Sequence, residues 1–259
     1  KSLGLFTNAK TIAFITGVGS VFVNPRETIW SKLVLFLVRL SYKTGLPSYN
    51  KIIFQNIDDF NLFRELSITK KNIKKIIVPG SGVRIATYES NLKIYPKNLT
   101  FGLASRMIKN KGIEEFCAAA KEINRNFLNI EFKIVGEFEE GLYSLQRKKT
   151  LDLLSESGVQ FLGWESQMEN FYKNISVFVL PSYREGTPKS ILEAMASGRP
   201  IITTNVPGCK ETVIENKNGF LVEVQNAYEL KVSMIKFIKD KNLLYTMGKN
   251  SHDMACEKY

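Results

Sequence analysis

From residue 99 onward the sequence alternates short β-branched apolar runs with longer amphipathic runs, and this alternation restricts the fold most strongly. The apolar runs have the length and residue types of buried strands, and the runs between them have a helical period. Strands that alternate with helices build right-handed βαβ units and therefore a parallel sheet. We expect strands at Thr100–Ala104, Glu131–Val135, Gln160–Leu162, Val177–Leu180, Ile201–Thr204 and Gly219–Glu223, and helices at Ile113–Arg125, Leu145–Ser157, Ser166–Lys173, Lys189–Ser197, Ala227–Lys239 and Leu243–Glu257.

The first part of the chain carries a sparser form of the same pattern. The polar, proline-containing stretch from Ser90 to Asn98 is typical of a linker. We therefore expect an α/β chain of two domains: an incomplete N-terminal domain with its linker over residues 1–98, and a C-terminal domain over residues 99–259. The elements expected in the first domain are strands at Thr11–Gly17, Lys51–Gln55 and Ile76–Val78 and helices at Thr28–Tyr42 and Asp58–Leu66.

The positive charge of the chain is concentrated in its first part. The whole sequence carries 36 lysines and arginines against 25 aspartates and glutamates, a net charge of +11. Residues 1–99 hold 15 against 5 of these, which leaves +10, and the remaining residues hold 21 against 20. Such asymmetry indicates two units with different duties, the first facing an anionic partner. A nucleic acid, an anionic membrane surface and a phosphorylated substrate all satisfy the charge alone.

Composition argues against several classes of site. The three cysteines lie far apart without a C-x-x-C pair, which argues against a disulfide framework and against a zinc ribbon. The single histidine excludes a metal site built from several histidines. No apolar run reaches the roughly 18 to 20 residues that a membrane-spanning helix needs.

The segment Pro181–Pro200 carries the clearest chemical signal. It predicts a strand end, a loop with Gly186, and a helix that has Pro188 at its first position. The N–H groups and the positive dipole end of a helix start form a cradle for phosphate or sugar oxygens. Glu185 and Glu193 stand with seven residues between them, and a carboxylate can accept two hydrogen bonds from a vicinal diol such as a ribose.

The same two glutamates match the E-x7-E motif of retaining GT-B glycosyltransferases. The surrounding sequence resembles the large family-4 type, which includes bacterial capsule, O-antigen and exopolysaccharide glycosyltransferases. This resemblance covers residues 100–255 and implies the GT-B fold, two Rossmann-like domains with parallel sheets. The other matching segments are Ala104–Arg106 with Lys109–Gly112, Ile134–Gly136, Val159–Gly163, Gly198–Ile201 and Asn218–Val222.

Three side chains are implied in the chemistry. The resemblance assigns Arg106 and Lys111 to the diphosphate of a sugar nucleotide and Glu185 to hydroxyls of the donor sugar. A departing diphosphate needs its charge neutralised by a metal ion or by arginine and lysine donors. Because the chain has no D-x-D motif, we expect the cationic side chains to serve, with neither a metal nor another cofactor.

The other implied contacts hold the nucleotide and the sugar. The resemblance assigns Glu193 to the ribose diol. The backbone close to the sugar and the phosphate would be that of Gly186, Thr187 and Pro188. Two further glycines either let the backbone approach the ligand or form tight turns, and these are Gly136 and Gly163.

The resemblance implies transfer of a hexosyl or N-acetylhexosaminyl group, with retention, from a nucleotide diphosphate donor, for which we expect a UDP-sugar. The expected acceptor is a polyprenyl-diphosphate-linked or other glycan in bacterial surface polysaccharide synthesis. The expected location is cytoplasmic, peripheral on the inner face of the cell membrane. Transfer to a soluble acceptor, and a truncated fragment that binds the donor without turnover, stay open. A nucleic-acid partner is not expected, because RNP-type aromatic residues and a recognisable reading helix are missing.

The stretch Thr28–Tyr42 has two interpretations. As a core helix it would bury its apolar side inside the domain. As a membrane-facing helix it would lay that side into the lipid interface, with its cations near lipid phosphates. The apolar residues at helical spacing are Trp30, Leu33, Leu37 and Leu40, and the cations are Lys32, Arg39 and Lys43.

Overall fold

The structure, a computed structural model, describes residues 10–18, 22, 29–69, 75–88, 95–139 and 144–259. By its internal contacts the chain divides into two compact units. The smaller unit comprises Lys1–Ser81 with Arg184–Thr187, and the larger unit comprises Gly82–Tyr183 with Pro188–Tyr259. The division after Ser81 falls earlier than the boundary we expected after residue 98.

The smaller unit contains a three-stranded parallel sheet in the order β1–β2–β3. Its register pairs Ala13 with Ile52 and Ile15 with Phe54, so these four side chains share one face of the sheet. They are buried together with Phe63 in the core of the unit. The elements are β1 (Ile12–Ile15), α2 (Ile29–Gly45), the 3-10 helix η2 (Leu46–Ser48), β2 (Lys51–Phe54), α3 (Ile57–Glu65) and β3 (Lys75–Ile77), which confirms the predicted strands and helices to within a few residues.

The larger unit contains a six-stranded sheet in the order β6–β5–β4–β7–β8–β9. All of its neighbouring strands run parallel, as the alternating pattern predicted. The sequence places β4 first in this sheet, yet β4 lies between β5 and β7, so the strand order reverses beside it. The strands are β4 (Leu99–Ala104), β5 (Ile130–Val135), β6 (Val159–Phe161), β7 (Val177–Leu180), β8 (Ile201–Thr204) and β9 (Gly219–Val222).

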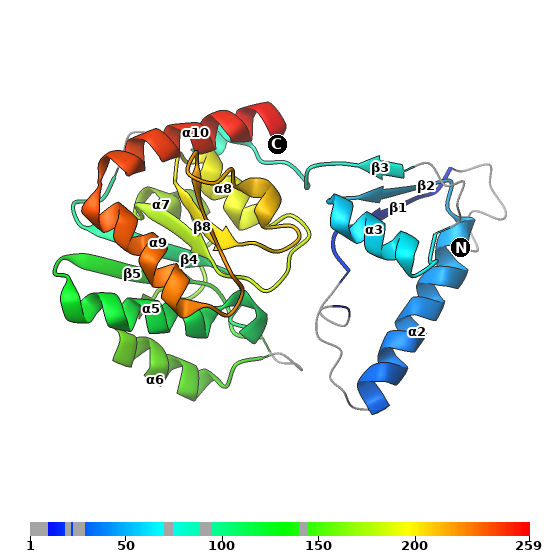
Figure 1. The fold of residues 1–259 in the computed structure, drawn as a ribbon, viewed down its shortest axis with the longest axis horizontal. Helices are drawn as coiled ribbons and strands as arrows, with labels where there is room; N and C mark the ends of the chain where they lie inside the picture. Colours follow the sequence, from blue (N-terminus) through cyan, green and yellow to red (C-terminus); the bar gives the residue numbers. More distant parts are fainter. Residues whose placement is uncertain (1–9, 19–21, 23–28, 70–74, 89–94, 140–143) are drawn as a thin grey trace. The chain divides into compact units, whose positions relative to one another are not determined.

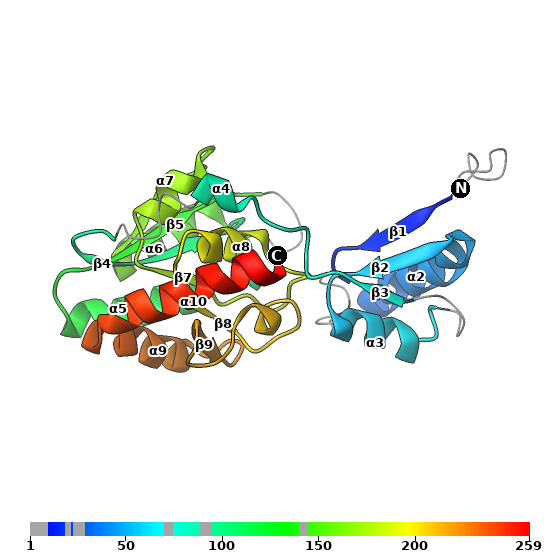
Figure 2. The same cartoon turned by 90° about the horizontal axis from the view of Figure 1, so that it is seen from above.

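Helices cover both faces of this sheet, and two apolar clusters fill the space beneath them. One cluster takes its helical side chains mainly from α5, α9 and α10, and the other takes them mainly from α4, α7 and α8 (Figures 1 and 2). None of the helices in the described ranges has both the length and the apolarity that crossing a bilayer requires. The helical elements are α4 (Ile85–Tyr88), η4 (Lys109–Lys111), α5 (Ile113–Asn126), α6 (Arg147–Ser157), α7 (Met168–Lys173), α8 (Lys189–Ala196), η5 (Lys210–Thr212), α9 (Ala227–Lys239) and α10 (Asn242–Lys258).

Residues before β4 already pack into the larger unit, which explains why the boundary between the units lies before residue 98. Tyr88 is buried in a core cluster of the larger unit. Within the expected linker, residues 90–94 lie outside the described residues, but Tyr95 packs into the same unit. Its hydroxyl donates a hydrogen bond of 2.8 Å to the Leu244 carbonyl, and the Arg199 guanidinium lies 4.6 Å from its ring centroid. The end of the expected linker is therefore part of the larger unit, because its aromatic residue is anchored there.

Candidate functional site

Most of the predicted site residues of the larger unit follow the carboxyl ends of its strands, and in a parallel sheet these ends lie at one edge. Arg106 follows β4, Gly136 follows β5, Gly163 follows β6, and helix α8 with Glu193 follows β7. In doubly wound sheets, ligands bind outside the carboxyl ends of the strands at the point where the strand order reverses. In this sheet that point lies beside β4, so the loops after β4 and β7 flank the candidate site.

These two loops are joined to each other by hydrogen bonds. The carbonyl of Asn110 accepts one of 2.9 Å from the Tyr183 N–H and one of 3.0 Å from the Ser182 hydroxyl. Gly112, at the end of the predicted phosphate-binding element, has a φ of +71°, and a Cβ there would lie 2.2 Å from the Pro181 carbonyl oxygen. A glycine is therefore required for the two loops to approach this closely.

The two predicted diphosphate ligands belong to the loop after β4. Arg106 is exposed, and its Nη1 lies 3.0 Å from Oε2 of Glu139. Exposed ion pairs of this kind stabilise a fold by only about 0–1 kcal/mol, so a phosphate can compete for the guanidinium at little cost. Lys111 ends the 3-10 helix η4 directly before α5 and is half-buried.

Glu193 is buried on α8, and the larger unit holds its carboxylate from several sides. Its Oε2 accepts a hydrogen bond of 3.0 Å from the Tyr172 hydroxyl, and its Oε1 lies 3.4 Å from Nζ of Lys189. The Tyr88 ring packs edge-on against that of Tyr172, with centroids 5.7 Å apart. Burial, followed by the charge of Glu193, raises the pKa of both Tyr88 and Tyr172. Both tyrosines were missed from the sequence, because an aromatic residue in a helical pattern indicates a core position.

Gly136 and Gly163, for which the sequence left both a tight turn and a ligand contact open, differ in their surroundings. A Cβ on Gly136 would lie 1.8 Å from the carbonyl oxygen of Ser105, so the close packing of two strand ends already requires this glycine. Gly163 has a φ of +73° with no atom within 4 Å of an added Cβ. Its carbonyl accepts a hydrogen bond of 2.8 Å from the Gly136 N–H, which joins the ends of β5 and β6. The positive φ fits a turn at Gly163, and backbone approach to a ligand there stays a prediction.

Pro188 precedes the first position of α8 rather than occupying it. It is the N-cap residue, in an extended conformation, and the helix begins at Lys189. Its carbonyl accepts the first helical hydrogen bonds, of 3.1 Å from the Ile191 N–H and 3.3 Å from the Leu192 N–H. The expected position of Pro188 is corrected by one residue, and the N–H groups of the first helical turn still follow the loop directly.

The remaining predicted residues, Glu185, Gly186 and Thr187, group with the smaller unit. In that unit Nδ2 of Asn56 donates a hydrogen bond of 3.0 Å to the Gly186 carbonyl. Arg184 forms an ion pair with the fully buried Asp59. A Cβ on Gly186 would lie 1.6 Å from the Thr16 carbonyl oxygen, so only glycine fits there. By internal contacts, Glu185 and Glu193 therefore belong to different units.

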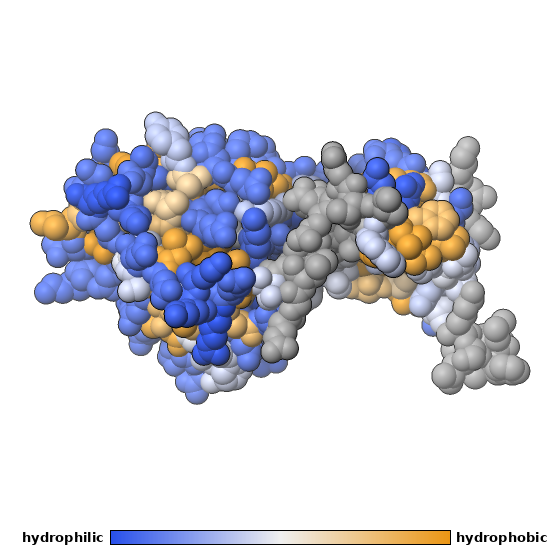
Figure 3. Space-filling model, turned by 90° about the horizontal axis from the view of Figure 1, so that it is seen from below, coloured by the Kyte–Doolittle hydropathy of each residue, from blue (hydrophilic) through white to orange (hydrophobic). Residues whose placement is uncertain are grey.

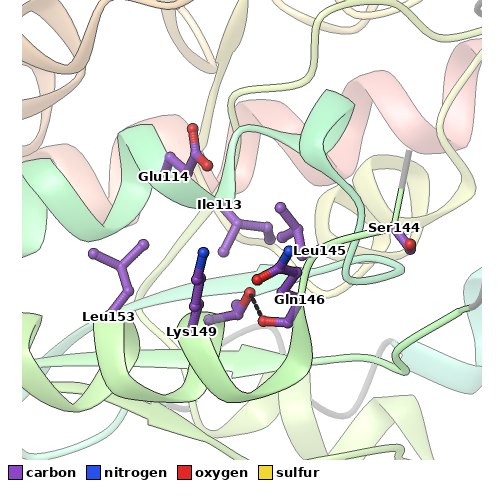
Figure 4. A pocket seen from close by; sticks show the side chains of 8 residues that line it. Ile113, Glu114, Ser144, Leu145, Gln146, Lys149 and Leu153 are labelled. Atoms are coloured by element: carbon purple, nitrogen blue, oxygen red, sulfur yellow. Dashed lines mark hydrogen bonds between the residues drawn. The ribbon is translucent and has the colours of Figure 1, made fainter. Parts of the chain in front are cut away.

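A pocket of about 300 Å³ lies between the start of α5 and α6 in the larger unit. Figure 4 shows Lys149 of α6 and Glu114 of α5 at this pocket. None of the predicted site residues is among the described residues that line it, which are Ile113, Glu114, Ser144, Leu145, Gln146, Lys149, Thr150 and Leu153.

Known proteins similar to this chain include enzymes of glycan synthesis. The chain is 26% identical over 257 residues to the N,N'-diacetylbacillosaminyl-diphospho-undecaprenol alpha-1,3-N-acetylgalactosaminyltransferase of Campylobacter jejuni, covering 95% of this chain and 65% of that protein. It is 32% identical over 167 residues to the capsular polysaccharide biosynthesis glycosyltransferase CapM of Staphylococcus aureus, covering 64% of this chain and 44% of that protein. The chain thus spans about two thirds or less of the length of these relatives.

A solved structure shows the same fold. The Anabaena protein Alr3699/HepE, crystallised in complex with UDP and glucose, matches with a TM-score of 0.78 at 17% identity, over 99% of this chain and 69% of that one. Together with the parallel sheets, this match confirms the expected GT-B fold class. The family described as "Glycosyl transferases group 1" matches residues 85–254. The chain belongs to the glycosyl transferases group 1 family, as the resemblance in its sequence indicated.

Proposed function

We propose that this protein transfers a hexosyl or N-acetylhexosaminyl group, with retention, from a UDP-sugar to a polyprenyl-diphosphate-linked glycan in bacterial surface polysaccharide synthesis. Family membership supports the reaction class. The acceptor is inferred from the Campylobacter relative, whose name specifies a diphospho-undecaprenol substrate, and UDP from the Anabaena protein. Because such an acceptor is anchored in lipid, we place the reaction at the inner surface of the cell membrane.

The observation that carries this proposal is the arrangement beside β4. Arg106 and Lys111 lie in the loop after β4, and α8 begins after the loop that follows β7, so the sheet order brings both loops to the edge where the strand order reverses. The two cations and the N-terminus of α8 would bind the diphosphate and stabilise the charge that develops as it leaves. We propose that this set neutralises the leaving group without a metal. Glu193 would accept the ribose hydroxyls, oriented by its hydrogen bond from Tyr172.

Calorimetric titration of UDP in the presence of a chelator tests the donor site. Arg106→Ala should weaken binding about 10- to 100-fold, because a charged hydrogen bond to phosphate contributes about 1.5–3 kcal/mol. Arg125→Ala is the matched control, since Arg125 is an exposed arginine that pairs with Glu122 on the same domain. Glu193→Gln should also weaken binding. Unchanged affinity in both site variants would refute the assignment, and UDP binding that appears only when a divalent cation is supplied would refute the metal-free mechanism.

Transfer to a synthetic polyprenyl-diphosphate-linked sugar separates turnover from binding. Wild-type protein should form a product whose anomeric configuration, read by NMR, matches that of the donor. We propose that Glu185 orients the donor sugar, so Glu185→Gln should lose turnover while keeping most of its affinity for UDP. Tight UDP binding by the wild type without any product would favour the alternative, a chain that binds donor but does not turn over.

A further inference from the structure

Helix α2 of the smaller unit has two apolar sides, and the structure buries only one of them. Leu35, Val38 and Tyr42 recur at helical spacing and are half-buried. The Tyr42 ring packs into the core of the unit, with its centroid 5.0 Å from that of Phe63. The buried Leu46 continues this inner side into η2. The inner side is therefore sufficient to anchor the helix.

The second apolar side faces solvent. Trp30 is 76% exposed, Phe36 is 60% exposed and Leu37 is 51% exposed. With about 100° between successive helical residues, the outward residues centre on the direction opposite to the inner side. Figure 1 shows α2 below the sheet, and the view from below in Figure 3 shows hydrophobic surface on this unit. We name this set the outer stripe, and it consists of Trp30, Leu33, Phe36, Leu37 and Leu40.

A row of cations borders the outer stripe. Lys32, Arg39 and Lys43 stand seven and four residues apart, so all three lie on one flank of the helix between its two apolar sides. Each of them is exposed. Residues 1–99, which include this helix, carry 15 basic against 5 acidic residues. An apolar stripe ending in a tryptophan and flanked by cations is complementary to the boundary between acyl chains and anionic headgroups.

We propose that α2 docks this protein on an anionic lipid surface, lying in the plane of the interface with the outer stripe among the acyl chains and the cation row on the phosphates. The choice of lipid over a protein partner rests on this charge pattern and on the proposed function, whose acceptor is anchored in lipid. The apolar residues singled out in the sequence, Trp30, Leu33, Leu37 and Leu40, are the exposed ones, while Tyr42 on the other side of α2 packs into the core of the unit.

Flotation with lipid vesicles tests this docking. The full chain should float with vesicles that contain phosphatidylglycerol and should float far less with phosphatidylcholine alone. Added salt should weaken retention, because it screens the headgroups. Replacing Lys32, Arg39 and Lys43 together with Gln should lower the partition coefficient roughly 100-fold. Replacing Trp30, Phe36 and Leu37 with Gln should abolish retention while leaving the fold intact, since all three are exposed and Gln favours helix.

Matched controls use equally exposed residues of the larger unit. One control replaces three exposed lysines with Gln, and these are Lys173, Lys217 and Lys239. The other replaces three exposed apolar residues with Gln, and these are Leu128, Ile214 and Tyr228. Both variants should stay bound to the vesicles. The chain has two tryptophans, so Trp164→Phe leaves Trp30 as the sole reporter. Its emission should shift to the blue on vesicle binding and should be quenched by brominated acyl chains.

Three results would overturn the proposal. The first is an absence of flotation with phosphatidylglycerol vesicles, and the second is retention that survives loss of the outer stripe. The third is self-association in sedimentation without lipid that the Gln substitutions in the outer stripe abolish, because a second copy would then cover α2. UDP titration of the same samples distinguishes failure of the docking from failure of the proposed function. Donor binding without flotation would refute only the docking. Flotation without donor binding would refute only the proposed function.

Discussion

Removal of the Tyr172 hydroxyl is the sharpest test of how the larger unit holds Glu193. Tyr172 is fully buried, and its hydroxyl lies 3.0 Å from Oε2 of Glu193 and 3.0 Å from the Ser190 carbonyl oxygen. The ring packs edge-on against Tyr88 and Phe178, each at a centroid distance of 5.7 Å. Tyr172→Phe keeps these ring contacts, so the substitution removes one donor and leaves the packing in place.

The expected loss follows from the nature of the acceptor. A hydrogen bond to a charged group contributes about 1.5–3 kcal/mol, whereas one between neutral groups contributes about 0.5–1.5 kcal/mol. Because the Glu193 side chain is only 11% exposed, water replaces the lost donor poorly. We therefore expect Tyr172→Phe to lower the free energy of unfolding by about 2 kcal/mol. At roughly 2–4 °C per kcal/mol, the melting temperature should fall by about 4–8 °C.

Urea denaturation at neutral pH measures the change, and a double-mutant cycle isolates the pair. In a Glu193→Gln background the acceptor is neutral, so Tyr172→Phe should cost about 1 kcal/mol less than in the wild type. Tyr228→Phe is the control, since Tyr228 is 68% exposed and its loss should change stability by less than about 0.5 kcal/mol. A Tyr172→Phe protein as stable as the wild type, or a cycle without coupling, would refute the hydrogen bond.

Glu139, Gly136 and Tyr183 allow three further tests. Glu139→Gln should strengthen UDP binding up to about fivefold in calorimetry, because the Glu139 carboxylate pairs with the Arg106 guanidinium and competes with the diphosphate for it. Unchanged or weaker binding would contradict this competition. Gly136→Ala should destabilise the larger unit by about 2–3 kcal/mol in urea denaturation, since the added Cβ would lie 1.8 Å from the Ser105 carbonyl oxygen. Gly45→Ala is the control and should be neutral or stabilising, because an added Cβ there has no atom within 4 Å. Burial raises the pKa of Tyr183 from 10.0 to about 12, so the stability this phenol contributes is complete below pH 10 and is lost as the pH rises toward 12. Absorbance of tyrosinate should lag behind that of the urea-unfolded chain over this range, and coincident titrations would exclude the shift.

The sequence alone determined the order and type of the main elements. Local period and composition decide between helix and strand, so runs such as Val177–Leu180 and Ile201–Thr204 coincide with β7 and β8. The parallel sheet followed from alternation, because βαβ connections allow few other arrangements. The family followed from ordered motifs, since a strand end, a glycine and a helix start recur at fixed spacing.

Tertiary structure alone decided which side chains surround Glu193 and which side of α2 is buried. Tyr172 and Glu193 stand 21 residues apart, and Tyr88 lies more than a hundred residues before the carboxylate. No local period encodes such contacts, because they arise only when separate helices close over the same face of a sheet. Likewise α2 has two apolar sides with similar spacing. The side that carries Tyr42 is the one that packs inward, because its ring contacts Phe63 in the core of the unit. Local sequence specifies the elements, whereas long-range packing specifies their partners.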